Sequence, residues 1–374
     1  MSGAPLRVAV LGAGTVGREV VRALVERSDD MRLPDGAPLH LAAVAVRDVG
    51  RAVAAGLPAA LLSDAPAHLV ADDGIDVIVE LMGGDEPAHT LIAAALSMGK
   101  SVVTANKHVI AHHGSELEAI ARRTGAALRF EAAVGGGIPI LGPLGGDLAA
   151  NRISRVRGIV NGTTNFILTS MTDERDPLDY ASALAEAQRL GYAEADPAGD
   201  VEGHDAANKL VILARLAFDR WLDPDAIPTR PDAVDGLAGP GITTVSLADQ
   251  AEARSVGRII RLVATAIRGD DDDVVAAVLP TALPIDSALG RTAGVRNRIE
   301  VDALPVGRVG FDGPGAGGAA TSSAVLGDLL AVARGAGSTW GPRSQAREPS
   351  GTGMSRPAGD VLQTSAGIRY PIDD

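Results

Sequence analysis

A glycine pattern close to the start of the chain constrains the fold more than any other feature. Residues 7–11 are a short apolar run rich in β-branched side chains, and residues 18–25 place apolar side chains on one helical face. Between these runs stands the sequence Gly-Ala-Gly-Thr-Val-Gly. A strand, a glycine turn of this spacing and a helix together are typical of a dinucleotide-binding fold.

The three glycines of this turn have separate physical roles. Gly12 allows the tight turn, Gly14 lets the backbone approach a pyrophosphate, and Gly17 lets the helix pack closely on the strand. Thr15 and Val16 complete the loop, where the free N–H groups of the helix start face the phosphates. We therefore predict that these five residues bind a nucleotide cofactor.

A charged pair follows the second predicted strand, residues 41–46, and bears on which cofactor binds. An acidic residue at this point would hold the ribose 2′-hydroxyl of NAD, whereas an arginine can receive the 2′-phosphate of NADP. Arg47 comes first, and Asp48 follows it. We predict NADP through Arg47, while Asp48 keeps NAD open and a solvated charge pair is the structural alternative.

Strands and helices continue to alternate through the first third of the chain. Residues 76–81 and 101–103 are predicted strands, and residues 87–98 are a predicted helix. This order predicts a Rossmann-type, doubly wound parallel sheet, whose ligands bind beyond the carboxyl ends of the strands. Three residues at that edge are predicted to face the cofactor or substrate: Gly83, Thr104 and Lys107.

A dense acidic stretch, residues 191–209, leads directly into an apolar run at residues 210–214. Asp205 and Lys209 are four residues apart, so they share one face of the helix that they begin. An ordinary surface ion pair of this spacing contributes only about 0.3–0.5 kcal/mol. Because the helix continues into apolar residues, we predict instead that Lys209 is at least partly buried and exchanges a proton near neutral pH.

Several flanking segments have simpler predictions. Residues 152–160 alternate as a strand, with Arg157 on the face opposite the apolar side chains. Thr163 or Thr164 is predicted to cap the helix that follows. Residues 241–268 show an apolar helical pattern.

Two further glycine clusters interrupt the chain. Residues 135–137 are three consecutive glycines, and their carbonyl groups could hold a cation together with the carboxylate of Glu131. From spacing alone, a backbone crossover between domains is the simpler explanation. Residues 313–321 form the second cluster, which opens a predicted helix at residues 324–333 and is a candidate for close approach to the cofactor.

Composition excludes several classes of function. The net charge of −13 comes without a long basic run, so we expect no nucleic-acid partner. Cysteine is absent, which excludes disulfides, thiolate metal sites and cysteine nucleophiles. The start of the chain lacks the pattern of a signal peptide, and no apolar run approaches the length of a membrane span. The prediction is a cytoplasmic protein without a membrane partner.

Taken together, these motifs resemble those of homoserine dehydrogenases, in the same order and over about residues 5–335. The motifs that carry the resemblance are residues 12–17, 104–107, 131–139, 161–165, 191–209 and 313–321. The resemblance implies NAD(P)-linked interconversion of L-homoserine and L-aspartate 4-semialdehyde, in the biosynthesis of threonine, methionine and isoleucine. It also implies a homodimer that joins through the sheet of an α+β substrate-binding and dimerisation domain.

The resemblance also implies roles for single residues. Lys209 is similar to the catalytic proton donor and acceptor, and Lys107 to the lysine between nicotinamide and substrate. Glu194 and Asp205 resemble the ligands of the substrate amino group, with Asp200 in the same pocket. A reduction of an aldehyde needs a hydride and a proton, and a positioned lysine can supply the proton.

Two further sites are implied by the same resemblance. Glu131, with the carbonyl groups of Val134, Gly136 and Ile138, corresponds to a site for a monovalent cation, Na⁺ or K⁺. Gly317 corresponds to a glycine that closes over the cofactor.

The predicted domains are a dinucleotide-binding domain at residues 1–135, a substrate, catalytic and dimerisation domain at residues 136–305, and a segment at residues 306–335 that returns to the first domain. Residues 336–374 are predicted to be a flexible tail, because they are rich in Gly, Pro, Ser and Arg without a sustained period. Within this tail, residues 336–358 read as a linker and residues 367–371 as a strand-like fragment without a domain to join. Many bacterial relatives continue there into a small regulatory amino-acid-binding domain. Feedback inhibition by threonine through such a domain is therefore in doubt.

Two other functions stay open from the sequence. One is a related amino-acid oxidoreductase of the same architecture, and the other is a catalytically silent nucleotide-binding sensor. The pair of Asp205 and Lys209 argues against the sensor, which has no need of a proton donor. Aspartate-semialdehyde dehydrogenase is disfavoured, because that enzyme requires a cysteine nucleophile.

Overall fold

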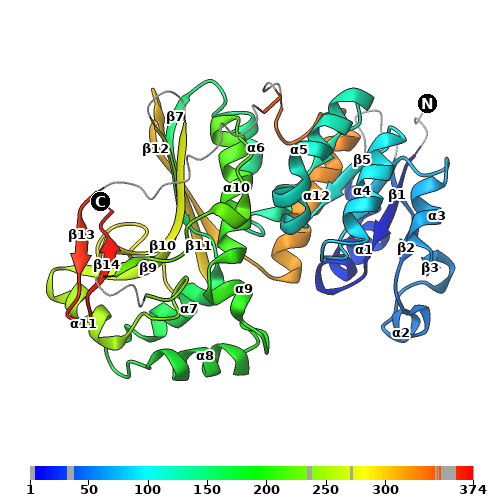
Figure 1. The fold of residues 1–374 in the computed structure, drawn as a ribbon. Coiled ribbons are helices and arrows are strands. Elements are labelled where there is room, and N and C mark those ends of the chain that lie inside the picture. Colours follow the sequence, from blue (N-terminus) through cyan, green and yellow to red (C-terminus); the bar gives the residue numbers. More distant parts are fainter. Residues whose placement is uncertain are drawn as a thin grey trace. The chain divides into compact units, whose positions relative to one another are not determined.

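The computed structural model describes residues 5–31, 38–233, 238–269, 273–341, 343, 345–346 and 359–373. The chain divides into two compact units (Figure 1). Unit 1 comprises Met1–Ala149 and Ala316–Ala346, and unit 2 comprises Ala150–Gly315 and Arg347–Asp374. Among the described residues, no helix combines the length and the apolar character needed to cross a bilayer.

Unit 1 is built on the predicted parallel sheet, whose six strands stand in the order β3-β2-β1-β4-β5-β6. These strands are β1 (Leu6–Leu11), β2 (Leu39–Ala45), β3 (Leu62–Ser63), β4 (Val77–Glu80), β5 (Ser101–Thr104) and β6 (Leu128–Arg129). β1 pairs in parallel with both β2 and β4, so the strand order reverses beside it. In open sheets of this kind, ligands bind at such a reversal, beyond the carboxyl ends of the strands.

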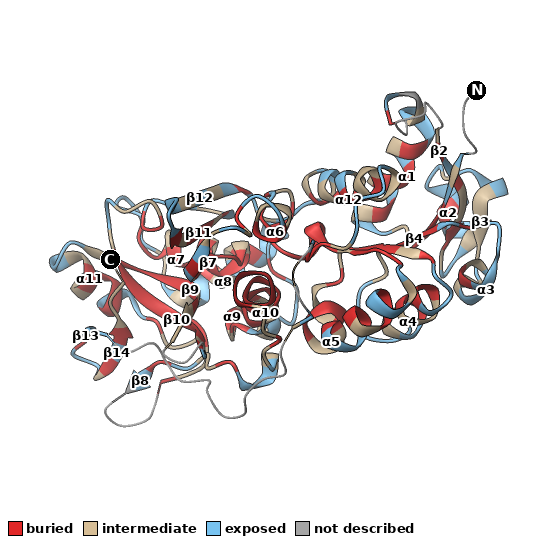
Figure 2. Cartoon of the chain, turned by 90° about the horizontal axis from the view of Figure 1, so that it is seen from above, coloured by how far each residue is buried: buried red, intermediate tan, exposed pale blue. Residues whose placement is uncertain are grey.

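Helices cover both faces of this sheet. They are α1 (Thr15–Glu26), α2 (Val49–Ala54), α3 (Pro66–Ala71), α4 (Ala88–Ser97), α5 (Lys107–Thr124), α6 (Leu141–Gly145) and α12 (Gly318–Ala333), with 3₁₀ turns η1 (Ser28–Asp30), η2 (Ala59–Leu61) and η3 (Glu131–Ala133). Figure 2 shows α1 and α12 on one face of the sheet and α4 and α5 on the other. Val325 and Leu329 of α12 join the apolar core formed by the strands and α1.

Unit 2 contains an antiparallel sheet of five strands in the order β10-β9-β7-β11-β12. These strands are β7 (Arg152–Ile159), β9 (Arg258–Arg268), β10 (Val274–Pro284), β11 (Arg296–Leu304) and β12 (Gly307–Pro314). The other elements are α7 (Gly162–Ser170), α8 (Tyr180–Arg189), α9 (Ala198–Val201), α10 (His204–Phe218), η4 (Pro224–Ala226) and α11 (Leu247–Ser255). The buried helix α10 packs against β7, β9 and β10, as its apolar run predicts.

The unit boundaries lie further along the chain than predicted. They fall at residues 149/150 and 315/316 instead of 135/136 and 305/306. The segment 136–149 stays with unit 1 because it packs tightly there: a Cβ atom on Gly145 would lie 2.1 Å from the carbonyl oxygen of Thr339. The three glycines at residues 135–137 therefore turn inside unit 1 and do not mark the crossover.

The prediction of a flexible tail at residues 336–374 is wrong at both ends. Trp340 is buried in unit 1, where its ring lies 6.1 Å from that of Phe130. Near the end of the chain, β13 (Val361–Gln363) and β14 (Ile368–Pro371) form a three-stranded sheet with β8 (Asp232–Ala233). β13 and β14 belong to unit 2, where β14 contacts β10 (Figure 1), and Tyr370 is fully buried. Residues 347–358, part of the predicted linker, lie outside the described residues.

One local prediction in unit 2 is also corrected. The segment at residues 258–268, part of the predicted helical pattern, is the strand β9. Residues 259–264 of this strand are buried on both faces, so their side chains do not show the alternation that marks a half-buried strand. Arg157 of β7 is buried, because the carboxylates of Glu300 and Asp373 pair with its guanidinium group.

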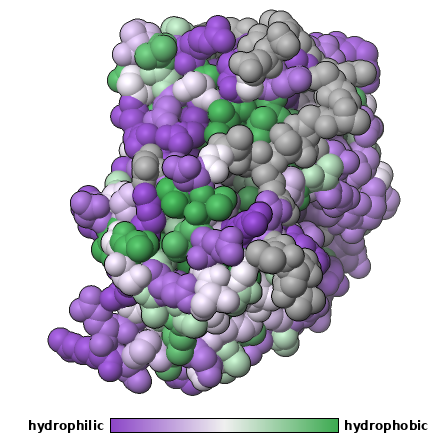
Figure 3. Space-filling view, turned by 60° about the vertical axis from the view of Figure 1, so that its left-hand side comes forward, coloured by the Kyte–Doolittle hydropathy of each residue, from purple (hydrophilic) through white to green (hydrophobic). Residues whose placement is uncertain are grey.

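The surface of unit 2 also carries apolar side chains. Figure 3 shows a mainly hydrophilic face with apolar patches between the polar side chains. The exposed apolar residues of unit 2 include Val256, Leu304 and Val306, of which Leu304 is 69% exposed.

Candidate active site

The nucleotide loop of unit 1 requires glycine at two of its three glycine positions for steric reasons. Gly12 follows β1 with a φ of +99°, and a Cβ atom on it would lie 2.6 Å from the carbonyl oxygen of Leu81. A Cβ atom on Gly17 would lie 2.0 Å from the carbonyl oxygen of Gly12. At Gly14, by contrast, the position of a Cβ atom has no heavy atom within 4 Å, so this glycine borders open space.

The second glycine cluster lies against this loop inside unit 1. Gly317 precedes α12 with a φ of +111°, which a side chain rarely adopts. A Cβ atom on Gly318 would lie 2.9 Å from the carbonyl oxygen of Thr15, the first residue of α1. The helices α1 and α12 thus start side by side, and both present their N-terminal N–H groups at this loop.

A buried carboxyl group organises the strand ends beside the loop, and sequence reasoning missed it. Glu80, the last residue of β4, accepts hydrogen bonds from the N–H groups of Met82 at 2.7 Å and Gly83 at 3.3 Å. Its other oxygen accepts a bond of 2.6 Å from the hydroxyl group of Thr104. Burial raises the pKa of Glu80 above its ordinary value. A glutamate at the end of an apolar strand was the available signal.

This arrangement changes the role predicted for Thr104. The residue is fully buried and its hydroxyl group donates to Glu80, so its side chain supports the loop of Gly83. Lys107 is half-buried at the first position of α5. Asn106 caps this helix by accepting from the N–H of Val109, and its amide group donates to the carbonyl oxygen of Gly84 at 2.8 Å.

The two charged residues after β2 have different roles in the structure. Arg47 and Asp48 are both exposed. Asp48 caps α2, because its carboxylate accepts a bond of 2.8 Å from the N–H of Arg51.

A hydrogen-bonded group at the centre of unit 2 joins Lys209 and Asp205 of α10 to Val160, Asn161 and Asp200 from two other segments. Lys209 is only 9% exposed, and its ammonium group donates to Asp205 at 2.6 Å and to the carbonyl oxygen of Val160 at 2.8 Å. Asn161 donates through its amide nitrogen to Asp205 at 2.8 Å and to Asp200 at 2.7 Å. The predicted pairing of Asp205 and Lys209 on one face of α10 is confirmed.

Asn161 is the residue that sequence reasoning missed in this group. Its side-chain oxygen accepts from the N–H of Thr164, so Asn161 caps α7, and neither of the threonines predicted for that role does. The amide group is then fixed with its two hydrogens on the carboxylates of Asp200 and Asp205. Burial and the negative charge of Asp205 raise the pKa of Asp200. The signal available in the sequence was an asparagine at a strand end before a helix.

Glu194, the other predicted substrate ligand, is not among the hydrogen-bonded residues described around Lys209. Its side chain is exposed, in the segment between α8 and α9. Gln188 of α8 donates from its amide group to the main-chain carbonyl oxygen of Glu194 at 3.1 Å. Thr163 donates to the carbonyl oxygen of Tyr192 at 2.7 Å, which fastens the start of the same segment to α7.

The predicted cation ligand Glu131 has a different task for its carboxylate. Both oxygens accept hydrogen bonds from the start of α6: from the N–H groups of Ile140 at 2.7 Å, Leu141 at 2.8 Å and Gly142 at 2.6 Å. Burial, with the charge of Asp328 nearby, raises the pKa of Glu131. The carboxylate is therefore engaged by the start of α6, and the cation site at this glycine turn stays a prediction.

Comparison with known proteins places these features in one family. A family model described as homoserine dehydrogenase matches residues 139–330, and a model described as the NAD binding domain of homoserine dehydrogenase matches residues 12–131. The homoserine dehydrogenase of Mycobacterium tuberculosis (strain ATCC 25618 / H37Rv) is 46% identical over 334 residues, which cover 88% of this chain and 73% of that protein. That of Corynebacterium glutamicum is 44% identical over 336 residues, or 89% and 73% of the two chains.

Solved structures give the same result. The homoserine dehydrogenase of Thiobacillus denitrificans matches with a TM-score of 0.81 and 39% identity, over 89% of this chain and 74% of that one. A hyperthermophilic archaeal homoserine dehydrogenase in complex with NADPH matches with a TM-score of 0.70 and 28% identity, over 87% and 97% of the two chains.

Proposed function

The chain belongs to the homoserine dehydrogenase family, and we propose that Lys209 is the proton donor and acceptor of an enzyme that interconverts L-homoserine and L-aspartate 4-semialdehyde. The observation that carries this proposal is the position of the Lys209 ammonium group, buried between Asp205 and the carbonyl oxygen of Val160. Two fixed acceptors hold the group in place, and its third hydrogen remains for a substrate oxygen.

Each direction of the reaction needs one proton transfer by Lys209. The bound nicotinamide cofactor supplies or accepts the hydride. In the reduction, the ammonium group of Lys209 gives a proton to the aldehyde oxygen as negative charge develops there, and the product is the primary alcohol. In the oxidation, neutral Lys209 removes the hydroxyl proton. General acid–base catalysis of this kind contributes about 10²- to 10⁴-fold to a rate.

The carboxylates around Lys209 suit a substrate with an ammonium group. We propose that Asp200 and Asp205 bind that group, because Asn161 holds their carboxylates on one side of α10. A third ligand, Glu194, is exposed and would join them through movement of its segment. A charged, hydrogen-bonded site of this kind rejects analogues that lack the amino group, since its own polar groups would then be left unpaired.

The cofactor is proposed to bind across the loop of unit 1. The residues concerned are Gly12, Gly14, Thr15, Val16, Gly17, Gly83, Lys107 and Gly317, with Thr104 as support. NADP is favoured because Asp48 is engaged as a helix cap, which leaves the exposed Arg47 to meet a 2′-phosphate. The solved archaeal relative in complex with NADPH supports this choice.

A monovalent cation is proposed to bind near η3 through main-chain carbonyl oxygens alone, those of Glu131, Val134, Gly136 and Ile138. Positive φ angles at Gly135 and Gly136 let the chain turn there. The homodimer, the cytoplasmic location and the place in threonine, methionine and isoleucine biosynthesis remain predictions. Leu304 and Val306, exposed beside the sheet of unit 2, suit a dimer surface.

The test is direct. Purified protein with L-homoserine and either NAD⁺ or NADP⁺ should generate reduced cofactor, measured by its absorbance. L-Alanine serves as the control, because it has the amino and carboxyl groups but no alcohol to oxidise. If neither cofactor is reduced while both bind, the chain is a nucleotide-binding sensor and the proposal fails.

A further inference from the structure

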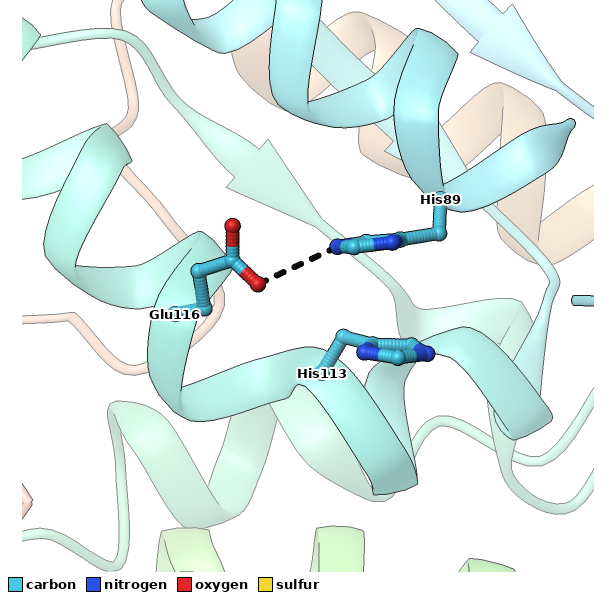
Figure 4. A group of neighbouring side chains, drawn as sticks. All are labelled: His89, His113 and Glu116. Carbon is cyan, nitrogen blue, oxygen red and sulfur yellow. Dashed lines mark hydrogen bonds and ion pairs between the residues drawn. The ribbon is translucent and has the colours of Figure 1, made fainter. Parts of the chain in front are cut away.

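Three side chains that the proposed chemistry does not use come together in unit 1, where α4 packs against α5. His89 lies on α4, and His113 and Glu116 lie on α5. One potential ligand atom from each of the three lies within 4.8 Å of the other two. Figure 4 shows the two imidazole rings one above the other, with the carboxylate of Glu116 turned towards His89.

The helical spacing explains why the group forms. His113 and Glu116 are three residues apart, so their side chains project from the same face of α5. His89 reaches that face from the first turn of α4, and its Nε2 lies 3.2 Å from the carboxylate of Glu116. The two rings are stacked with centroids 3.9 Å apart and an interplanar angle of 12°.

Each histidine also has a carboxylate on its other ring nitrogen. Nε2 of His113 lies 2.8 Å from Asp85, and Nδ1 of His89 lies 3.3 Å from Glu86. In metal sites, a carboxylate behind each histidine fixes its tautomer and turns the opposite nitrogen towards the ion. The nitrogens left for an ion are Nε2 of His89 and Nδ1 of His113.

We propose that His89, His113 and Glu116 form a binding site for a divalent transition-metal ion of the zinc type. Two imidazole nitrogens and one carboxylate oxygen are a ligand set that zinc accepts, with water in the remaining position. Asp85 and Glu86 are the supporting carboxylates. None of these five residues belongs to the proposed catalytic or cofactor-binding set, so the proposal does not depend on the proposed function.

Binding requires a small rearrangement of these side chains. A bound ion lies in the plane of each imidazole ring, about 2.0–2.2 Å from its ligands, so the stacked rings must tilt apart. The side chains of His89, His113 and Glu116 are 19%, 28% and 57% exposed, which leaves them room to move and leaves the site open to solvent. The bound ion would then join α4 to α5, and by mass action it would stabilise unit 1.

The experiment is titration of the full-length, tag-free protein with Zn²⁺ by calorimetry, together with the visible spectrum of the Co²⁺ complex. We expect one ion per chain and the intense absorption of low-coordinate Co²⁺ with histidine ligands. His113→Ala and Glu116→Gln should abolish both signals, and Asp85→Asn should weaken binding by roughly tenfold. His68→Ala is the matched control, since His68 is an exposed histidine elsewhere in unit 1, and it should bind as the parent does.

Two results would overturn the site. The first is absence of Zn²⁺ binding to the parent protein, which would leave only a hydrogen-bonded cluster. The second is equal binding by the His113→Ala and His68→Ala variants. Retained cofactor binding by His113→Ala, together with an unchanged circular dichroism spectrum, shows that the variant is folded, so that loss of the ion is a loss of ligand.

Discussion

The carboxylate of Asp205 lies 2.6 Å from the ammonium nitrogen of Lys209, one turn along α10. Both side chains are only 11% exposed, so this pair differs from a solvated surface pair of the same spacing. Removal of one partner would leave a buried charge without compensation, which is strongly unfavourable. The pair therefore needs further polar partners, and Asn161 and the carbonyl oxygen of Val160 provide them.

Replacement of Lys209 tests the proton transfer. Lys209→Arg keeps a cation beside Asp205, but a guanidinium group does not release its proton near neutral pH. We expect kcat to fall by about 10²- to 10⁴-fold in both directions, while the affinity for NADPH stays unchanged in a fluorescence titration. Activity within a few fold of the parent would show that another group transfers the proton.

The glycine loop offers a pair of matched substitutions. Gly17→Ala places a methyl group 2.0 Å from the carbonyl oxygen of Gly12, so it should lower the free energy of unfolding by roughly 1–3 kcal/mol or more. Gly14→Ala meets no protein atom within 4 Å, so the melting temperature should be kept while cofactor affinity falls, because the methyl group occupies space for the pyrophosphate. Equal melting temperatures for the two variants would contradict this division of roles.

Arg47→Ala tests the choice of cofactor. Loss of a hydrogen bond to a charged phosphate costs about 1.5–3 kcal/mol, or roughly tenfold to a hundredfold in affinity. We expect KM for NADP⁺ to rise by that factor and KM for NAD⁺ to stay nearly constant. The neighbouring substitution Arg51→Ala is the control, since the N–H of Arg51, and not its side chain, meets Asp48. An equal rise for both cofactors would dismiss the role of Arg47.

The raised pKa of Glu80 predicts that the stability of the fold depends on pH. Burial raises its pKa in the folded protein above the ordinary value of 4.5, so the folded state favours the protonated form. Its contribution is full below pH 4.5 and is lost as pH rises through the raised pKa. Glu80→Gln removes this ionisation and keeps an oxygen for the N–H groups of Met82 and Gly83. The variant should therefore gain stability relative to the parent as pH rises.

Thermal melting of both proteins in a pH series from acidic to mildly alkaline buffer measures this difference. A gap that stays constant across the series would show that Glu80 does not titrate differently in the folded and unfolded chains.

Tyr370 tests whether the end of the chain belongs to unit 2. Deletion of a buried aromatic side chain costs roughly 3–5 kcal/mol, so Tyr370→Ala should lower the melting temperature clearly. Arg369 lies on the same strand with its side chain exposed, and Arg369→Ala should have little effect. Chemical denaturation of the two variants gives the comparison. Similar denaturation midpoints would show that residues 359–373 do not contribute to the fold of unit 2.

The parts of the structure that could be predicted are those encoded by short-range patterns. The order of strand, glycine turn and helix predicts the parallel sheet, and the spacing of four residues predicts the pairing of Asp205 and Lys209. Longer-range partnerships carry no local signal. Asn161 is separated from Asp200 by 39 positions and from Asp205 by 44, and its spacing shows only a helix cap.

Two other differences between the predictions and the structure have physical causes. Residues 259–264 of β9 are buried on both faces, so the period of their side chains does not separate strand from helix. Glu131 stands beside three glycines that resemble a ligand loop, yet its carboxylate meets the N–H groups of α6. That contact depends on the tertiary turn at residues 135–140, which composition alone does not give.

The path of the chain also sets the order in which unit 1 can be completed during translation. Val325 and Leu329 fill part of its apolar core, together with side chains of β1 and α1 from the first 25 residues. The ribosome therefore makes the whole of residues 150–315 before the last wall of the nucleotide-binding unit exists. Until α12 emerges, α1 covers only part of that face of the nascent sheet. The second unit is thus free to fold while the first still awaits its final helix.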